Sequence, residues 1–290
     1  MKNKNIEGAK NEKNPSTIGL FFFYFKEKAP FPSTEQLLQK MKDKLGDIDI
    51  VSDSEAVKMF SISDYLVRYE NNQEVPAQLI ITNFNEINQE LITPQIKTQF
   101  WNFPDFQPVL DACHWQIMIS DFMAYGLHPH KRAELLSKWI DITLDLFPTC
   151  QAVYYAPSEN LLSAEKARNN PYEGHFRYLH GGLNCRYFRI QDSDDMLVDS
   201  LGLHLLPLPD VQYHFHSLNP SDIVKHAYNI AYYQYEKEAS IASGHTVQGL
   251  SEDQKWVCQY ENSLLQPTRV LLDVNTGEYA SGSRGTEAET

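Results

Sequence analysis

The chain has 290 residues, of which 42% are hydrophobic and 22% charged, with a formal net charge of −13. This composition excludes a chain that is disordered throughout, and the length suits one large domain or two ordinary ones. The negative charge argues against nucleic acid and against an anionic membrane as partners, because both attract clustered Lys and Arg. It permits a basic protein partner, although ordinary solubility also explains it.

Cysteine usage predicts a reducing compartment. Cys113, Cys150, Cys185 and Cys258 are far apart and form no C-x-x-C pair. Residues 1–14 are polar and lack the apolar segment of a signal peptide. We therefore expect free thiols and a cytoplasmic protein rather than a disulfide framework.

The first part of the chain predicts strands around one helix. We expect residues 1–15 to be a disordered leader, and the apolar run 18–25 to be a buried strand, since it is far shorter than the ~20 residues that span a bilayer. A capping-box pattern at Ser33–Gln36 then opens a helix that ends at Gly46. Further strands are predicted near 48–51, 57–69 and 77–83.

Residues 85–110 are predicted to be irregular, with three prolines among aromatic side chains. Two interpretations stay open: a covering loop that inserts its aromatic side chains into the core, or a lid over a site.

A strand from His114 to Ser120 is followed by a long helix over 131–147. Its broad apolar stripe includes Trp139, which we expect to be buried. A strand is predicted over 152–155, and Ser158 is expected to cap a short helix through about Ala167.

The second part predicts strands around another helix. After a strand over 183–190, two extended segments flank a Pro-rich corner at Pro207 and Pro209, and Asn219-Pro220 opens a helix over about 220–237. Late strands are predicted near 256–260 and 269–274. The expected fold is α+β, a mixed sheet with helices packed on it as a two-layer sandwich. It forms one compact unit of two halves, 16–157 and 158–274, with a disordered tail over 275–290.

The candidate binding residues surround the Pro-rich corner. Strand periodicity places Gln212, His214 and His216 on one face, and we expect the corner to bring them close to acidic and imidazole groups nearby. The full candidate set is Asp199, His204, Asp210, Gln212, His214 and His216. The alternative is that Asp210 and Asn219 only cap turns and that the histidines are solvated.

Other histidines form secondary candidate loops at His128 and His130, and at His175 and His180. No histidine pattern has a diagnostic metal spacing such as H-E-x-x-H, so neither a metal nor a cofactor is predicted. The sequence also contains no G-x-S-x-G elbow, P-loop, G-x-G-x-x-G or kinase signature. An enzyme is therefore not predicted, although it is not excluded.

Three stretches together resemble the bacterial domain-of-unknown-function family 4261 (DUF4261). They are 114–155, which begins with His-Trp-Gln-Ile-Met-Ile, 198–246, which contains Asp-Ser-Leu-Gly-Leu and Ser-Gly-His-Thr, and 266–273, Gln-Pro-Thr-Arg-Val-Leu-Leu-Asp. The resemblance covers roughly residues 17–274. The resemblance implies a bacterial cytoplasmic protein related to accessory or protective proteins of bacterial competition, and it brings no catalytic residues.

Two functional hypotheses follow. The first is a non-catalytic protein-binding module, of an immunity or secretion-accessory type, whose partner would be a toxin or a secretion component; its stock of 16 tyrosines suits an interface. The second is an enzyme with a histidine-lined site, either with or without a bound metal. The sequence leaves the oligomeric state and the identity of any partner open.

Overall fold

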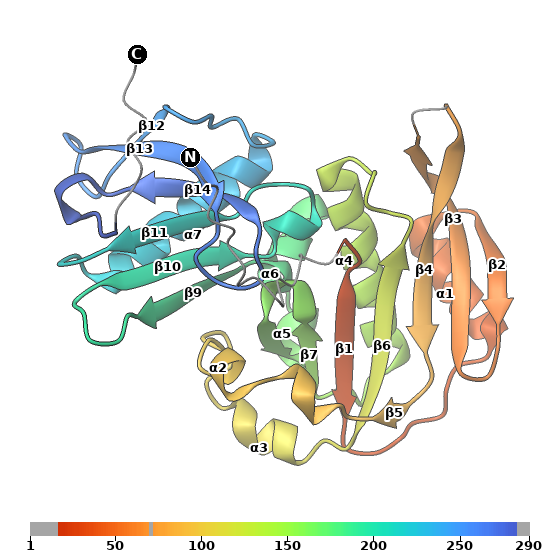
Figure 1. The fold of residues 1–290 in the computed structure, drawn as a ribbon. Helices are drawn as coiled ribbons and strands as arrows, with labels where there is room; N and C mark the ends of the chain where they lie inside the picture. The colour runs from red at the N-terminus through yellow and green to blue at the C-terminus, as the bar shows by residue number, and fades with distance from the viewer. Residues whose placement is uncertain (1–16, 70–71, 283–290) are drawn as a thin grey trace, which may run out of the picture.

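The computed structural model describes residues 17–69 and 72–282, so the expected leader lies outside the described residues. The fold is α+β, as predicted, and consists of two sheets placed side by side with helices packed on them (Figure 1). Among the described residues, no helix has both the length and the apolar character needed to cross a membrane.

The first sheet is antiparallel and has the order β2-β3-β4-β6-β1-β7-β8, with β5 paired to β6. Its strands are β1 Leu20–Phe25, β2 Ile48–Asp53, β3 Val57–Arg68, β4 Glu74–Thr82, β5 Asn85–Glu86, β6 Trp115–Phe122, β7 Ala152–Tyr155 and β8 Asn160–Ser163. The apolar strand β1 lies between β6 and β7, and its residues 21–25 are buried, as the unbroken hydrophobic run predicts.

Helices α1, Thr34–Leu45, and α4, Pro129–Leu146, cover one face of this sheet (Figure 1). Ser33 forms the expected capping box, and Trp139 on α4 is completely buried. The opposite face is covered by the segment from Ile87 to Cys113, which includes α2 Pro94–Lys97 and α3 Phe106–Asp111 and packs Phe100 against Phe22 and Tyr154. This segment is therefore a covering loop that inserts aromatic side chains into the core.

One local prediction near β8 is wrong. Ser158 does not cap a helix; it ends a 3-10 turn, Ala156–Ser158, and its hydroxyl donates to the Gly181 carbonyl. The chain then forms β8, so the first sheet extends past residue 157, and Ser163 caps the short helix α5, Ala164–Arg168. Pairing with β7 decides the outcome, because Leu161 and Leu162 become completely buried there.

The second sheet has the order β12-β13-β14-β11-β10-β9 and is mixed, since β11 and β14 run parallel. Its strands are β9 Asn184–Arg189, β10 Met196–Leu201, β11 Val211–Phe215, β12 Thr246–Gln248, β13 Lys255–Asn262 and β14 Val270–Asn275. β10 continues through Leu201 and is followed by a 3-10 turn, Leu203–Leu205. The short helix α6, Leu179–Gly182, precedes β9.

The two faces of the second sheet differ in polarity. Tyr213 and Val274 belong to the face whose apolar residues pack with helix α7, Pro220–Glu236. The other face carries a polar row in which paired residues come from neighbouring strands. This row consists of Arg186, Asp199, Gln212, Asp273 and Gln259.

The two halves share one hydrophobic cluster, which includes Phe21 of the first sheet and Val274 of the second. A buried ion pair adds to this junction: the Arg132 Nε donates to Asp121 Oδ2 at 2.8 Å, and its Nη1 contacts the Leu205 carbonyl. Residues 276–282, expected to be disordered, instead form a 3-10 turn at Gly277–Tyr279 and a bridge between Ala280 and Phe215. The rest of the expected tail, 283–290, lies outside the described residues.

Candidate functional site

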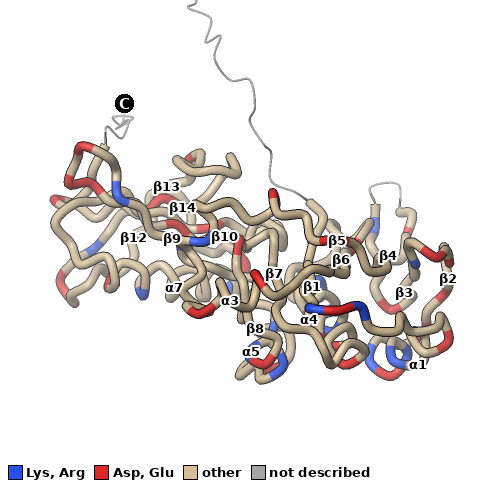
Figure 2. Tube along the Cα trace, turned by 90° about the horizontal axis from the view of Figure 1, so that it is seen from below, with Lys and Arg blue, Asp and Glu red and all other residues tan. Residues whose placement is uncertain are grey.

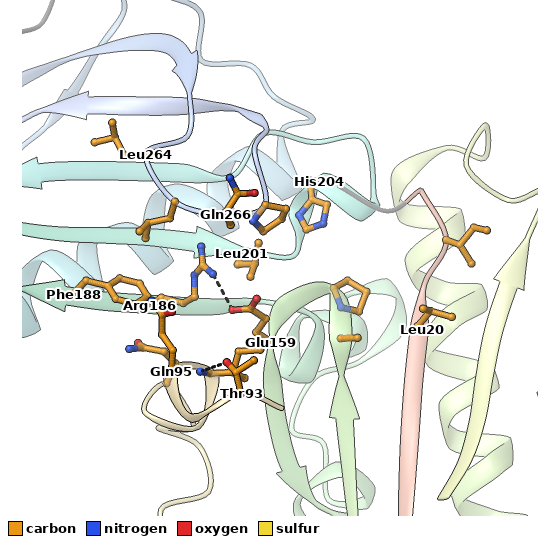
Figure 3. A pocket seen from close by; sticks show the side chains of 17 residues that line it. Leu20, Thr93, Gln95, Glu159, Arg186, Phe188, Leu201, His204, Leu264 and Gln266 are labelled. Atoms are coloured by element: carbon orange, nitrogen blue, oxygen red, sulfur yellow. Dashed lines mark hydrogen bonds and ion pairs between the residues drawn. The ribbon is translucent and has the colours of Figure 1, made fainter. Parts of the chain in front are cut away.

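A cavity of about 800 Å³ lies between the two sheets (Figure 3). Its walls come from the covering loop, from the turn before β8, from β9 and β10, and from the loop before β14. The polar side chains that line it are Thr93, Gln95, Gln99, Glu159, Arg186, His204 and Gln266, and the apolar ones include Ile18, Leu20, Phe188 and Leu264. The covering loop therefore serves both as core and as one wall of the cavity.

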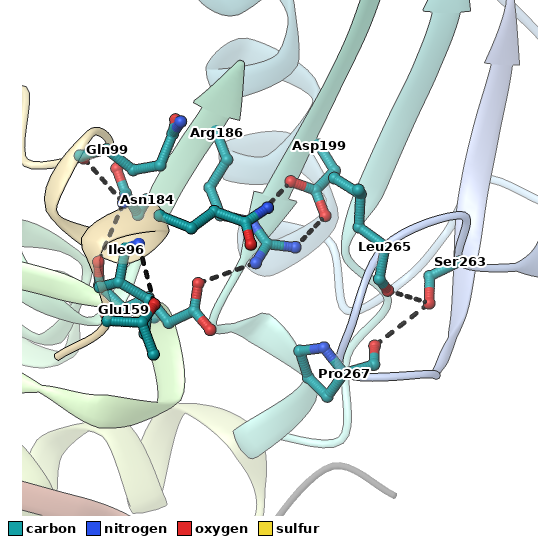
Figure 4. Close-up of polar contacts among 12 residues, drawn as sticks. Ile96, Gln99, Glu159, Asn184, Arg186, Asp199, Ser263, Leu265 and Pro267 are labelled. Carbon is teal, nitrogen blue, oxygen red and sulfur yellow. Dashed lines mark hydrogen bonds and ion pairs between the residues drawn. The ribbon is translucent and has the colours of Figure 1, made fainter. Parts of the chain in front are cut away.

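A buried charge network forms the floor of this cavity, which it reaches through Glu159, Arg186 and His204. Figure 4 shows the contacts of Arg186 with Asp199 and Glu159 within this network. Asp199 is completely buried and binds two guanidinium groups. Arg186 makes a bidentate contact, with Nε 2.9 Å from Oδ1 and Nη2 2.6 Å from Oδ2, while Arg269 Nη2 lies 2.9 Å from Oδ2. Such paired contacts offset the large cost of burying a charge.

Asp210 is the second completely buried carboxylate of the network. Its Oδ2 accepts from Arg269 Nε at 2.9 Å and lies 3.0 Å from His204 Nδ1, and its Oδ1 accepts from the Ser200 hydroxyl and the Leu203 amide. Burial by itself would raise the pKa of Asp210, but Arg269 and these hydrogen bonds hold that pKa well below its usual range.

Glu159 closes the network at the cavity surface. Its Oε2 accepts from Arg186 Nη1 at 2.8 Å, and its side chain is 23% exposed whereas that of Arg186 is 4% exposed. Glu159 also adopts a left-handed backbone conformation, with φ 48°, which is costly for a residue with a side chain. Three carboxylates thus face two guanidinium groups in this network, an excess of one acidic group.

His204 is the imidazole of the cavity. Because Asp210 is an acceptor only, His204 Nδ1 carries the proton and donates, which leaves Nε2 as a lone-pair nitrogen with no protein partner among the described residues. An imidazole oriented by a buried carboxylate in this way can accept a hydrogen bond from a ligand or act as a general base.

The structure separates the six sequence candidates into two groups. Asp199, His204, Asp210 and Gln212 gather at the cavity; Gln212 holds its wall by accepting from the Leu264 amide at 2.8 Å. β10 and β11 pair as expected, but His214 and His216 lie toward the other end of β11. His214 Nε2 lies 3.7 Å from Asp195 Oδ2, and His216 Nδ1 lies 2.9 Å from the Ser217 hydroxyl.

The sequence reasoning missed Glu159, Arg186 and Arg269. Two of them carried a usable signal, because Arg186 lies inside the predicted strand 183–190 and Arg269 at the start of 269–274. A charge within an apolar strand needs a buried partner. Glu159 carried no such signal in the sequence, since its partner Arg186 is 27 residues away.

The four secondary histidines also lie at two separate places in the structure. His128, His130 and His175 come together: the His130 and His175 rings are stacked with centroids 4.1 Å apart, and those of His128 and His130 lie 5.4 Å apart. His180 is not among their ring contacts; its Nε2 lies 3.2 Å from the Lys166 carbonyl and its ring contacts Tyr172.

Three partly buried histidines predict that the stability of the fold falls in mild acid. Burial lowers the pKa of His175, His180 and His226 below the ordinary value of 6.5. The unfolded chain therefore binds protons more readily, so this stabilisation is complete above about pH 6.5 and is lost as the pH falls through the lower folded values. We expect the thermal midpoint to be lower at pH 5.5 than at pH 7.5.

His226→Gln should flatten this pH dependence. Its Nδ1 lies 2.7 Å from the Tyr213 hydroxyl and its Nε2 2.7 Å from the Gln248 carbonyl, an arrangement that suits a neutral ring. His216→Gln, at a surface histidine, is the control. Equal midpoints at the two pH values for the wild type would contradict the assignment.

Comparison with known proteins finds one relationship. Residues 199–275 match the model of a family described as a domain of unknown function, DUF4261, which confirms the predicted family over these residues. The match includes Asp199, His204, Asp210 and Arg269, whereas Glu159 and Arg186 lie outside it. Searches of curated proteins and of solved structures found no match.

Proposed function

We propose that the chain is a non-catalytic protein-binding module whose cavity receives a basic side chain from a partner. The observation that carries this proposal is the partly exposed Glu159 carboxylate at the mouth of a network in which both guanidinium groups are already neutralised by carboxylates. A Lys or Arg side chain would find there the excess negative charge and the free imidazole nitrogen of His204.

The cavity walls support the same proposal. Ile18, Leu20, Phe188 and Leu264 offer apolar surface around the charged floor, which suits the aliphatic stem of a basic side chain and the apolar residues beside it. The net charge of −13 would also attract a basic partner. Figure 2 shows acidic and basic residues interspersed over both halves, without a continuous basic band in that view.

The expected setting is the bacterial cytoplasm, with a toxin or a secretion component as the partner. Its support is the family match together with the four cysteines, which are all free and buried as a reducing compartment allows.

A pull-down from the native host in mild salt tests the proposal. We expect Glu159→Gln to lose at least nine-tenths of a partner that the wild type recovers, because the variant removes the exposed charge but keeps the shape. The matched control is His216→Gln, which lies away from the cavity and should recover the partner fully. Equal recovery with Glu159→Gln, or repeated recovery of nothing by the wild type, would count against the proposal.

The pair of Asp210 and His204 favours a second candidate, an enzyme in which His204 acts as a general base. Its specific support is the 3.0 Å contact between Asp210 Oδ2 and His204 Nδ1, which orients the free Nε2. Turnover of a component of a metabolite extract, followed by NMR and abolished in His204→Gln but retained in His216→Gln, would favour this candidate over the binding module.

A further inference from the structure

A second cluster of chemically capable side chains lies apart from the cavity, where the start of α4 meets the end of α7. His128 and His130 come from the N-terminal end of α4, and Glu238 follows α7, 110 residues from His128. His128 Nε2 lies 3.1 Å from Glu238 Oε2, and His130 Nδ1 lies 4.0 Å from Glu238 Oε1. One ligand atom from each of the three residues can be chosen so that all lie within 4.8 Å of one another.

The hydrogen bonds around His130 leave the nitrogen that a metal would need. His130 Nε2 lies 2.9 Å from the Tyr235 carbonyl, which can only accept, so Nε2 carries the proton and Nδ1 presents its lone pair toward Glu238. A histidine that donates its other N–H to a backbone carbonyl is the usual arrangement of a metal ligand.

His175 and Tyr235 hold this ring in place. His175 stacks on His130 with an interplanar angle of 16°, and its Nδ1 lies 2.8 Å from the Tyr235 hydroxyl, which itself donates to the His175 carbonyl. Glu238 and Ala239 both adopt left-handed backbone conformations, with φ 53° and 59°. Two such residues in succession are costly without glycine, and here they place Glu238 beside the histidines.

We propose that His128, His130 and Glu238 form a binding site for a divalent transition metal of the Zn²⁺ class. Two imidazoles and one carboxylate suit such an ion, whereas Mg²⁺ and Ca²⁺ prefer oxygen ligands throughout. Ligands of a tetrahedral zinc lie about 3.4 Å apart, given metal–ligand distances of about 2.1 Å. The present separations need only small side-chain rotations, which the exposure of His128 and Glu238 permits.

The ion would connect the two halves of the fold, since α4 packs on the first sheet and α7 on the second. With three protein ligands, a fourth coordination position would remain for water or for a group from a partner. The metal site shares no residue with the cavity, so its test is independent of the test of the proposed function.

Calorimetric titration of the full chain with Zn²⁺ alone, after treatment with a chelator, tests the site. We expect one equivalent to bind and to raise the thermal midpoint by several degrees. His128→Gln and Glu238→Gln should each weaken binding at least tenfold while leaving the zinc-free midpoint nearly unchanged, because both side chains are about half exposed.

Two control variants locate the ion. His216→Gln and His204→Gln should bind Zn²⁺ as the wild type does, since neither lies at this cluster. The proposal would be overturned if the wild type failed to bind one equivalent of Zn²⁺ at a metal concentration of about 100 µM. Binding that survives in both His128→Gln and Glu238→Gln, or that is lost in His204→Gln, would overturn it equally.

Discussion

Arg269→Ala is expected to lower the free energy of unfolding by about 3–5 kcal/mol, because it removes one partner of a buried charge network. The Arg269 side chain is 2% exposed and contacts Asp199, Asp210, the Ser200 carbonyl and the Pro267 carbonyl. Without it, Asp210 loses the one guanidinium contact that the described residues give it, and Asp199 retains that of Arg186. Two carboxylates would then be buried with too little positive charge.

Denaturant unfolding measures the effect, and Arg189→Ala is the matched control. Arg189 belongs to the same sheet but is exposed, and its Nε donates to the Tyr187 hydroxyl, so its loss should change stability by less than about 0.5 kcal/mol. The loss of stability for Arg269→Lys should lie between the losses for Arg269→Ala and Arg189→Ala. A lysine keeps the charge but cannot donate to both carboxylates with a planar, forked guanidinium group. If Arg269→Ala lowers the free energy of unfolding no more than Arg189→Ala does, the charge network contributes little to stability.

Trp139→Ala is expected to cost a similar 3–5 kcal/mol, for a different reason. Trp139 lies mid-way along α4, is completely buried, and fills space between that helix and the first sheet. Its truncation removes the largest type of side chain from the core and leaves a cavity that the surrounding strands can only partly close. The indole N–H also donates to the Ile80 carbonyl at 3.3 Å, and that bond is lost as well.

The chain supplies its own control for this prediction. Trp101 is 55% exposed on the covering loop, so Trp101→Ala should change the free energy of unfolding by less than about 1 kcal/mol. Trp139→Phe keeps most of the volume but not the N–H donor, and should therefore cost less than Trp139→Ala. If Trp139→Ala unfolds at nearly the wild-type denaturant midpoint, the packing of α4 is assigned incorrectly.

The local elements and their buried faces could be predicted from the sequence by itself. The apolar run 18–25 predicted a doubly buried strand, the stripe on 131–147 predicted the burial of Trp139, and Ser33 and Asn219 predicted two helix starts. Each signal lies within one element, where periodicity and capping act through neighbours a few residues apart. The Ser158 prediction failed because pairing with β7, a tertiary contact, outweighed a weak capping signal.

Only the tertiary structure decided which polar residues meet. Asp199 and Arg269 are 70 residues apart, Glu159 and Arg186 are 27 apart, and His128 meets Glu238 across 110 residues. Strand alternation could place Gln212 and His214 on one face. It could not show that Gln212 contacts Asp273 and the Leu264 amide while His214 faces Asp195. The order of strands in a sheet and the packing of α4 against the end of α7 depend on long-range burial, and periodicity within single elements carries no information about it.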